Sequence, residues 1–429
     1  MSCSLCRLPF TVSSSSISPQ PPPPGILTEK QFLYMKHAVG MGEHTPGLVV
    51  DMVNLNNNTF TVNNSTMLIN IIWETNDTTF VALHPHCATI LRHHLGYTTN
   101  SPEHLIELSL LDKIVGPTMG GVHAGRFKDI NYEGILGKGD KNRVDIESFW
   151  SKDGNECPGF DWLGWQRRGL DWTAARPDVF PRFRPQVAPT RISSLGLIPQ
   201  STEDIITTQP LDVLHVLLPY LDPKSFVNLL STCRTLRHHA LTTFQPQART
   251  QVLKLGWAVP TEVEYASFVR RNPPPPAATS PTSSSTETSP PSCDKPSEAD
   301  AASATPRPET SDTPPEPAKD QPDFSLVTMA HAAHSPADAD WYLYLSQVHR
   351  SQGMRARRWV WALAEEVTRV YHKKRAAGPY APVVDADGKE TKSPKWKAYA
   401  QHVQQPLMMR PFMTGAVGPA KGGAKRFTW

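Results

Sequence analysis

The chain has 429 residues, of which 39% are hydrophobic and 19% charged, with 42 prolines, six cysteines and a formal net charge of +3. This length allows two or three domains, because one hydrophobic core rarely organises more than roughly 250 residues. Six cysteines are too few for a disulfide scaffold, and no apolar run reaches the ~18 residues of a membrane-spanning helix. The first residues also lack the pattern of a secretory signal. We therefore expect a protein of the cytoplasm, the nucleus or both, without membrane contact.

The first 200 residues divide into two parts. A Ser/Pro run at 13–24 indicates a flexible N-terminus at 1–25, and residues 26–200 are predicted to form a mixed α/β region. Strands are expected where β-branched and aromatic residues stand between Asn clusters, at 49–53, 59–62, 67–73 and 78–83. Helices are expected at about 85–95 and from Pro102 to 114, with Ser101 as the N-cap of the second. Three tryptophans between 154 and 172 are expected to anchor an irregular core.

Two short motifs in this part could bind a metal. Cys3 and Cys6 are spaced as half of a tetrahedral zinc site, and His84 and Cys87 could supply the other half. The separation of nearly 80 residues is much longer than in ordinary zinc fingers, so we favour a cysteine pair without metal and expect no cofactor. A protein whose fold depends on bound zinc remains a further hypothesis, which predicts stoichiometric metal after purification.

The segment 210–241 has the pattern of three short helices. Its leucines recur at three- and four-residue spacings, Pro210 suits a first helical turn, and Pro219 requires the first helix to be short or kinked. Asp222 and Pro223 are typical of the N-cap and first position of a second helix, and a third is expected around 234–241. About 32 residues cannot stabilise a core alone, so another part of the chain or another protein must cover these leucines.

This segment resembles an F-box, the helical module that docks substrate receptors onto the Skp adaptor of cullin-RING ubiquitin ligases. The family's Pro, its aliphatic positions and its Tyr-Leu match residues 210–221, and its late Cys-Arg-x-x-Arg matches Cys233, Arg234 and Arg237. Gln209, Thr232 and Leu236 depart from the pattern. The resemblance implies partner binding through helix-surface recognition, by Pro210, Leu211, Leu214, Leu217, Leu218, Leu221, Pro223, Phe226, Leu229, Cys233 and Leu236.

A wider resemblance to fungal F-box proteins covers the flanking segments. It rests on the N-terminal Cys-x-x-Cys, an aromatic and Gly-rich middle, and a basic Trp-rich segment around 340–359 that follows the box. The structural alternative to an F-box is an ordinary helical hairpin buried inside a larger domain. The two differ in whether the leucine-rich helices keep an uncovered apolar face.

The last part of the chain changes composition twice. Residues 273–322 contain 14 prolines and no Phe, Tyr or Trp, which predicts a disordered linker at 272–325. Residues 341–429 then carry 16 Lys/Arg against 5 Asp/Glu, which predicts a basic helical region at 326–429. Its main helix is expected at about 338–375, with a bend near Gly353. Such a helix more often packs on its own domain than binds nucleic acid.

No Ser-His-Asp set, HExxH motif, nucleophile elbow or phosphate loop can be found in the sequence, so we predict a protein that is not an enzyme. The expected fold class is α+β, with an F-box-like module at 201–271. The leading hypothesis is an F-box substrate receptor that binds the Skp adaptor and cullin ligase and presents an unknown client for ubiquitination. The alternative is a nucleic-acid or acidic-partner binding protein that uses the basic C-terminal helix.

Overall fold

The structure is a computed structural model, and it describes most of the chain in separate ranges. These ranges are 2–11, 21–44, 47–56, 59–62, 65–68, 80–116, 125–135, 144–150, 159–196, 204–271, 337–385 and 387–404. The predicted linker at 272–325 lies outside the described residues, as does most of the strand expected at 67–73. The described part combines helices with two sheets, so the fold class is α+β as expected.

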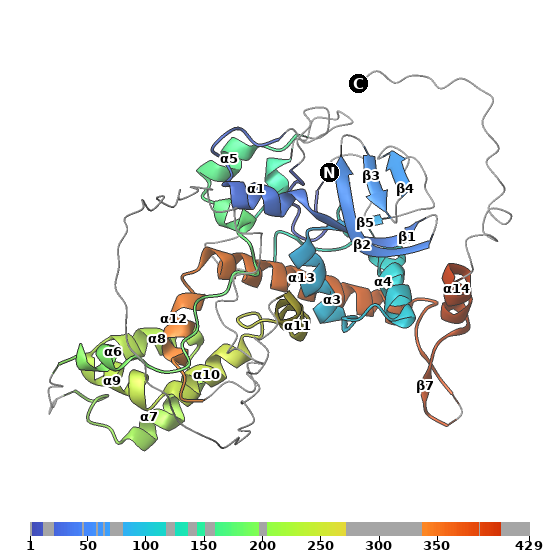
Figure 1. The fold of residues 1–429 in the computed structure, drawn as a ribbon. Helices are drawn as coiled ribbons and strands as arrows, with labels where there is room; N and C mark the ends of the chain where they lie inside the picture. Colours follow the sequence, from blue (N-terminus) through green and yellow to red (C-terminus); the bar gives the residue numbers. More distant parts are fainter. Residues whose placement is uncertain are drawn as a thin grey trace, which may run out of the picture.

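A five-stranded antiparallel sheet occupies one end of the molecule, with the strand order β4-β3-β2-β1-β5 (Figure 1). Val39 in strand β1, which lies between β2 and β5, pairs with Met52 on one side and with Leu83 on the other. The strands expected at 49–53 and 59–62 are confirmed, because both segments lie in strands of this sheet. The bounds are β1 (Ala38–His44), β2 (Gly47–Asn56), β3 (Thr59–Val62), β4 (Ser65–Leu68) and β5 (Phe80–Leu83).

Helices α1 (Glu29–Lys36), α3 (Pro85–Leu95) and α4 (Pro102–Val115) flank this sheet. The Ser101 side chain accepts a hydrogen bond from the backbone of His104 at the start of α4, which confirms the expected N-cap. Helix α3 ends at Gly96, whose φ of 76° is a left-handed conformation that favours glycine. Helix α4 packs on β1 and β2, and α3 follows directly after β5.

The N-terminal residues are part of the core of this region. Cys3, Leu5, Leu8 and Phe10 are at most 2% exposed, and the backbone N–H of Ser4 donates to the carbonyl of Ala82 at 2.8 Å. The prediction of a flexible N-terminus at 1–25 is therefore wrong for residues 2–11. The Ser/Pro run that predicted flexibility lies after this segment. Residues 2–11 themselves carry apolar side chains, which are buried in the core that they share with the sheet and α3.

Aromatic side chains organise the segment from 144 to 183, as expected. The tryptophans Trp162, Trp165 and Trp172 are at most 5% exposed, and the Trp162 and Trp165 rings meet edge to face at 5.8 Å between centroids. The helical turns here and as far as residue 193 are short because Gly and Pro interrupt the chain: η2 (Glu147–Phe149), α5 (Trp162–Arg167), η3 (Asp171–Ala174) and α6 (Pro189–Ser193).

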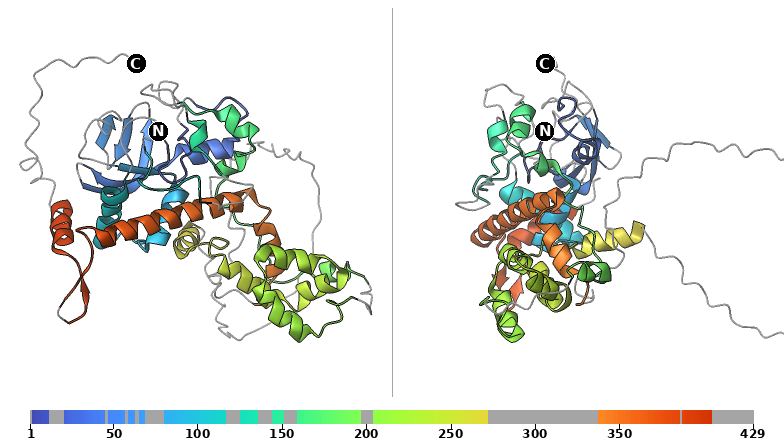
Figure 2. Two further views of the ribbon diagram at one scale, coloured as in Figure 1. Left: turned by 180° about the vertical axis from the view of Figure 1, so that it is seen from behind. Right: turned by 90° about the vertical axis from the view of Figure 1, so that its left-hand side faces the viewer.

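A second core lies in a helical module at the other end of the molecule (Figures 1 and 2). Its helices come from two distant parts of the sequence, so the predicted module boundary at 201–271 omits an element. Helix α12 follows the predicted linker and inserts the buried Trp341 and Leu345 between α8 and α10. The bounds are α7 (Leu211–Leu217), η4 (Leu218–Tyr220), α8 (Pro223–Ser231), α9 (Arg234–Thr242), α10 (Gln245–Lys254), α11 (Glu262–Arg271) and α12 (Trp341–Val348).

The long helix α13 (Gln352–Ala377) joins the two cores (Figure 1). It begins after a break at residues 349–351, close to the expected bend, and Ser351 caps it by accepting from the Met354 backbone. Met354 belongs to the second core, and residues from Ala356 to Tyr371 belong to the first. The hairpin of β6 (Val383–Val384) and β7 (Glu390–Thr391) leads to α14 (Pro394–Gln404), which packs on α4. Among the described residues, no helix combines the length and apolarity that crossing a membrane requires.

Candidate functional site

The first candidate site is the surface formed by α7 and η4. Asp212 favours the positive N-terminal end of α7, and Pro219 cannot donate the backbone hydrogen bond that would continue the helix. Helix α7 therefore stops at Leu217 and tightens into the 3₁₀ turn η4, as the sequence predicts. Asp222 then starts α8 by accepting from the backbone N–H groups of Lys224 and Ser225 at 3.0 and 3.1 Å. The hydrogen bonds from Ser225 hold the pKa of the Asp222 carboxyl below its usual value.

The two sides of α7 and η4 both carry apolar side chains. Leu214 and Leu218 face the core of the module and are 4% and 0% exposed. A second stripe faces outward at spacings of three and four residues, which place its members on one helix face. Its members, Val213, Val216, Leu217 and Tyr220, are 38%, 63%, 53% and 85% exposed. We call these four residues together with the exposed Leu211 the α7 face.

Exposed apolar side chains are concentrated at this place. Among the described residues, eleven large hydrophobic side chains are exposed, and seven of them lie between Ile205 and Tyr220. The others are scattered over α1, α5 and the β6 strand. Single exposed hydrophobic residues are normal on a protein surface, whereas a contiguous group marks an interaction site.

Polar contacts from α10 hold the backbone beneath the α7 face. The Gln251 side-chain amide donates to the carbonyls of Leu218 at 3.4 Å and Leu221 at 3.0 Å. Lys254 donates to the carbonyl of Pro219 at 3.5 Å. The backbone carbonyls at the end of η4 thus accept hydrogen bonds from α10. These bonds fix the backbone that carries the exposed stripe.

The predicted partner-binding residues separate into two groups. Leu214, Leu218, Phe226 and Leu236 are at most 4% exposed, so their assignment to a binding surface is corrected: they form the module's own core. The remaining predicted residues are exposed or partly exposed: Pro210, Leu211, Leu217, Leu221, Pro223, Leu229 and Cys233. The prediction missed Val213, Val216 and Tyr220. Their three- and four-residue spacing with Leu217 is the sequence signal that identifies them.

Most cationic side chains of α13 interact with acidic or aromatic side chains of the same protein. Arg357 pairs with Glu264, Arg375 pairs with Glu107 at 2.8 Å, and Lys374 pairs with Asp129. The Arg355 guanidinium lies 4.0 Å from the centre of the Trp172 ring. This helix packs on its own domain, as the sequence favours.

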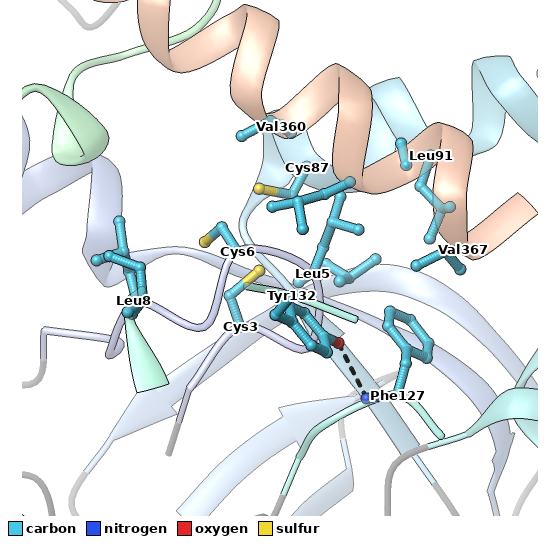
Figure 3. Packing of buried hydrophobic residues seen from close by; sticks show 14 of the residues in the cluster. Cys3, Leu5, Cys6, Leu8, Cys87, Leu91, Phe127, Tyr132, Val360 and Val367 are labelled. Atoms are coloured by element: carbon cyan, nitrogen blue, oxygen red, sulfur yellow. Dashed lines mark hydrogen bonds between the residues drawn. The ribbon is translucent and has the colours of Figure 1, made fainter. Parts of the chain in front are cut away.

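The second candidate site is a buried cluster of three thiols and one imidazole. Cys3, Cys6, His84 and Cys87 are at most 2% exposed, and one possible ligand atom from each lies within 4.8 Å of all the others. The Nδ1 atom of His84 is 3.3 Å from the sulfur of Cys6. Figure 3 shows the sulfur atoms of Cys3, Cys6 and Cys87 gathered at one point beneath helix α13. The fold therefore brings together the two pairs of possible zinc ligands, Cys3 with Cys6 and His84 with Cys87, which are far apart in the sequence.

The turn that carries Cys3 and Cys6 is held on several sides. The N–H of Arg7 donates to the Cys3 carbonyl at 2.9 Å, and the N–H of Cys3 donates to the Leu8 carbonyl at 3.0 Å. Arg7 has a φ of 62°, which reverses the chain after Cys6 and is rare for a residue with a side chain. Its guanidinium is fixed by Glu147 at 2.6 Å, and its carbonyl accepts from the Trp150 indole at 3.1 Å.

Electrostatics makes the three thiols unequal. Burial would raise the pKa of Cys3, but hydrogen bonds from Cys6, Cys87 and His84 hold it well below its ordinary value. Burial and the bond to Cys3 raise the pKa of Cys6 well above its ordinary value. The pKa of Cys87 is raised by its bonds to Cys3 and Cys6 and by burial.

Comparisons with family models, with curated proteins and with solved structures found no match to this chain. The F-box resemblance of residues 210–241 therefore depends on the residues themselves and on the surface that they form.

Proposed function

We propose that the chain is an F-box-type substrate receptor that binds the Skp adaptor of a cullin-RING ubiquitin ligase through the α7 face. The observation that carries this proposal is the uncovered stripe of Val213, Val216, Leu217 and Tyr220 in the segment that resembles the F-box. A helix of a folded domain normally buries its apolar residues. Here the core-facing stripe is already satisfied by Leu214 and Leu218, so the outer stripe is free to enter a groove of a partner.

Helix α12 supports this proposal because it packs against α8 and α10 and contributes to the core of the module. Trp341 is fully buried among the module helices, and the N–H of Tyr342 donates to the Gln245 side chain at 3.0 Å. Helices α7, α8 and α9, which form the segment that resembles the F-box, therefore obtain a core from their own chain and still present one apolar face. This arrangement suits a docking module that stays folded before its partner binds.

In this proposal the protein has no catalytic role and acts in the cytoplasm, the nucleus or both. The client is an unknown protein, which the sheet region or the C-terminal helices would select. The alternative of nucleic-acid or acidic-partner binding through the basic C-terminal helix gains no support from α13, because Arg357, Lys374 and Arg375 already pair with acidic residues.

The test is capture of the purified Skp adaptor by the full chain. We expect Val216→Glu combined with Leu217→Glu to reduce capture at least about 30-fold, which corresponds to a loss of ~2 kcal/mol at a binding hot spot. The matched control is Leu163→Glu, which changes a 47% exposed leucine on α5. Equal capture by wild type and the double variant, with unchanged circular dichroism, would contradict the proposal.

A further inference from the structure

We propose that Cys3, Cys6, His84 and Cys87 bind one Zn²⁺ ion, which fastens the N-terminal turn to helix α3. This site is separate from the α7 face, so the inference does not depend on the proposed function. Its basis is the convergence of four buried donor atoms from two segments that are 78 residues apart at their nearest ligands, Cys6 and His84.

The distances suit a tetrahedral ion. With Zn–S bonds of about 2.3 Å and Zn–N bonds of about 2.0 Å, neighbouring ligand atoms in a tetrahedron of three sulfurs and one nitrogen stand roughly 3.5–3.8 Å apart. Cys6 Sγ and His84 Nδ1 are already 3.3 Å apart, and all four ligand atoms lie within 4.8 Å of one another. Small side-chain rotations close the remaining difference, and the backbone can stay where it is.

The type of the donors selects the metal. Three sulfur atoms and one imidazole nitrogen form a Cys₃His set, a common composition of structural zinc sites. Calcium and magnesium prefer oxygen ligands, and the cluster contains no carboxylate. All four ligands come from the protein and none is more than 2% exposed, so no coordination position is left for a substrate. The site is therefore structural.

The imidazole of His84 is held in a position that suits a metal ligand. Its Nδ1 atom faces the thiol group of Cys6 at 3.3 Å, so the ring presents one nitrogen to the sulfur atoms. The ring is clamped by Phe10 at 4.7 Å and by Tyr34 at 5.4 Å between centroids. These contacts keep the ring in place beside the sulfur atoms, as a metal ligand requires.

The protein also stabilises the negative charge of the thiolates. His84 is the N-cap of α3 and Cys87 lies in its first turn, where the helix dipole favours anions. The backbone N–H of His84 points to the Cys3 sulfur at 3.4 Å. The Tyr132 hydroxyl donates to the Ser4 carbonyl at 2.6 Å and thereby fixes the loop between the two cysteines from outside. The binding site is therefore organised before the ion arrives.

The first experiment measures metal in the full wild-type chain. We expect about one zinc per chain by elemental analysis and three fewer titratable thiols than after denaturation with a chelator. A strong chelator should lower the thermal midpoint by roughly 5–10 °C, and added zinc, but not magnesium, should restore it. Folded wild-type protein with less than about a tenth of a zinc per chain after growth with zinc, and with an unchanged midpoint on chelation, would overturn the proposal.

The second experiment uses matched variants. His84→Cys converts the set to four cysteines, a known zinc composition, and should keep one zinc per chain, whereas His84→Asn should lose it. Cys293→Ser, which lies outside the described residues, is the control for removal of a thiol and should keep the metal. A disulfide between Cys3 and Cys6 in the wild type, seen by mass spectrometry, or equal zinc in His84→Asn and wild type, would contradict the assigned ligands.

Discussion

Arg357 and Glu264 form a two-pronged ion pair in the interior of the protein, with Nη1 and Nη2 of the guanidinium each 2.7 Å from a carboxylate oxygen. Arg357 is fully buried and Glu264 is 6% exposed. The guanidinium also donates to the carbonyls of Trp257 at 2.7 Å and Pro177 at 3.3 Å. This one side chain thus connects α13, α11 and the aromatic segment where the two cores meet.

Loss of this ion pair should destabilise the whole chain. We expect Glu264→Gln to lower the free energy of unfolding by about 3–5 kcal/mol, because it leaves the buried guanidinium of Arg357 without a counter-charge. Chemical denaturation followed by circular dichroism measures the change. The control is Glu366→Gln, which breaks the surface pair with Arg369 and should cost less than about 1 kcal/mol. Similar losses in the two variants would contradict the structural role of the buried pair.

Acid should destabilise the protein in two steps. Burial lowers the pKa of His94 from 6.5 to about 4, and its ring meets Trp361 edge to face at 4.4 Å. A histidine whose pKa is lower in the folded state contributes stability above pH 6.5 that is lost as the pH falls toward 4. The pKa of Glu264 would be raised by burial, but Arg357 lowers it below 4.5, so its contribution is lost only as the pH falls below that value.

Thermal unfolding between pH 7 and 3 tests this order. His94→Gln should flatten the dependence between pH 6.5 and 4, and Glu264→Gln should flatten it below pH 4.5. If His94→Gln instead flattened the curve only below pH 4.5, and Glu264→Gln flattened it between pH 6.5 and 4, the assignment of the two steps to these residues would be wrong.

Neighbouring leucines on α7 should have opposite roles. Leu214→Ala removes a side chain that is 4% exposed and should cost roughly 2–4 kcal/mol of stability. Leu217→Ala removes one that is 53% exposed and should change stability by less than about 0.5 kcal/mol. Denaturation curves for both variants check this. If Leu217→Ala destabilised the chain as strongly as Leu214→Ala, the α7 face would be part of the core.

Glu107 should hold the C-terminal hairpin and α14 against α4. Its buried carboxylate accepts from Arg375 at 2.8 Å, Lys392 at 3.0 Å and the Trp396 indole at 3.0 Å. We expect Glu107→Gln to increase hydrogen exchange in α14 at least about tenfold, because Arg375 loses its counter-charge and Lys392 keeps only the exposed Glu103. Glu103→Gln is the control: Glu103 also pairs with Lys392 but is 60% exposed, so exchange in α14 should stay within about twofold. Equal exchange in the two variants would contradict the prediction.

Local features of the fold were predictable from the sequence. Ser101 before Pro102, and Asp222 before Pro223, identify the starts of α4 and α8, because an N-cap and a proline act within one helical turn. The break before α13 also follows from local residues. In each case the physical cause lies within a few positions of its effect.

Long-range features were not predictable in the same way. The spacing of Leu214 and Leu217 shows an apolar helix but does not say which side is covered, since the core that buries Leu214 also contains Trp341 of α12, which follows the predicted linker at 272–325. Likewise, the pairing of Cys6 with His84 depends on the hairpins between them, which return the chain to the N-terminal turn. The sequence supplied both zinc half-sites as a hypothesis, but only the fold brings them together.

Trp341 fills the core of the helical module, and this has a consequence for a chain that is cut between residues 272 and 336. The packing of α12 between α8 and α10 requires no covalent continuity through residues 272–336. A protease site engineered into that interval should give two polypeptides that elute together, because the downstream piece already fills the interior of the upstream one. Dilution alone should then not separate the two polypeptides, and denaturant should be needed, as for enzymes that reassemble from complementary fragments.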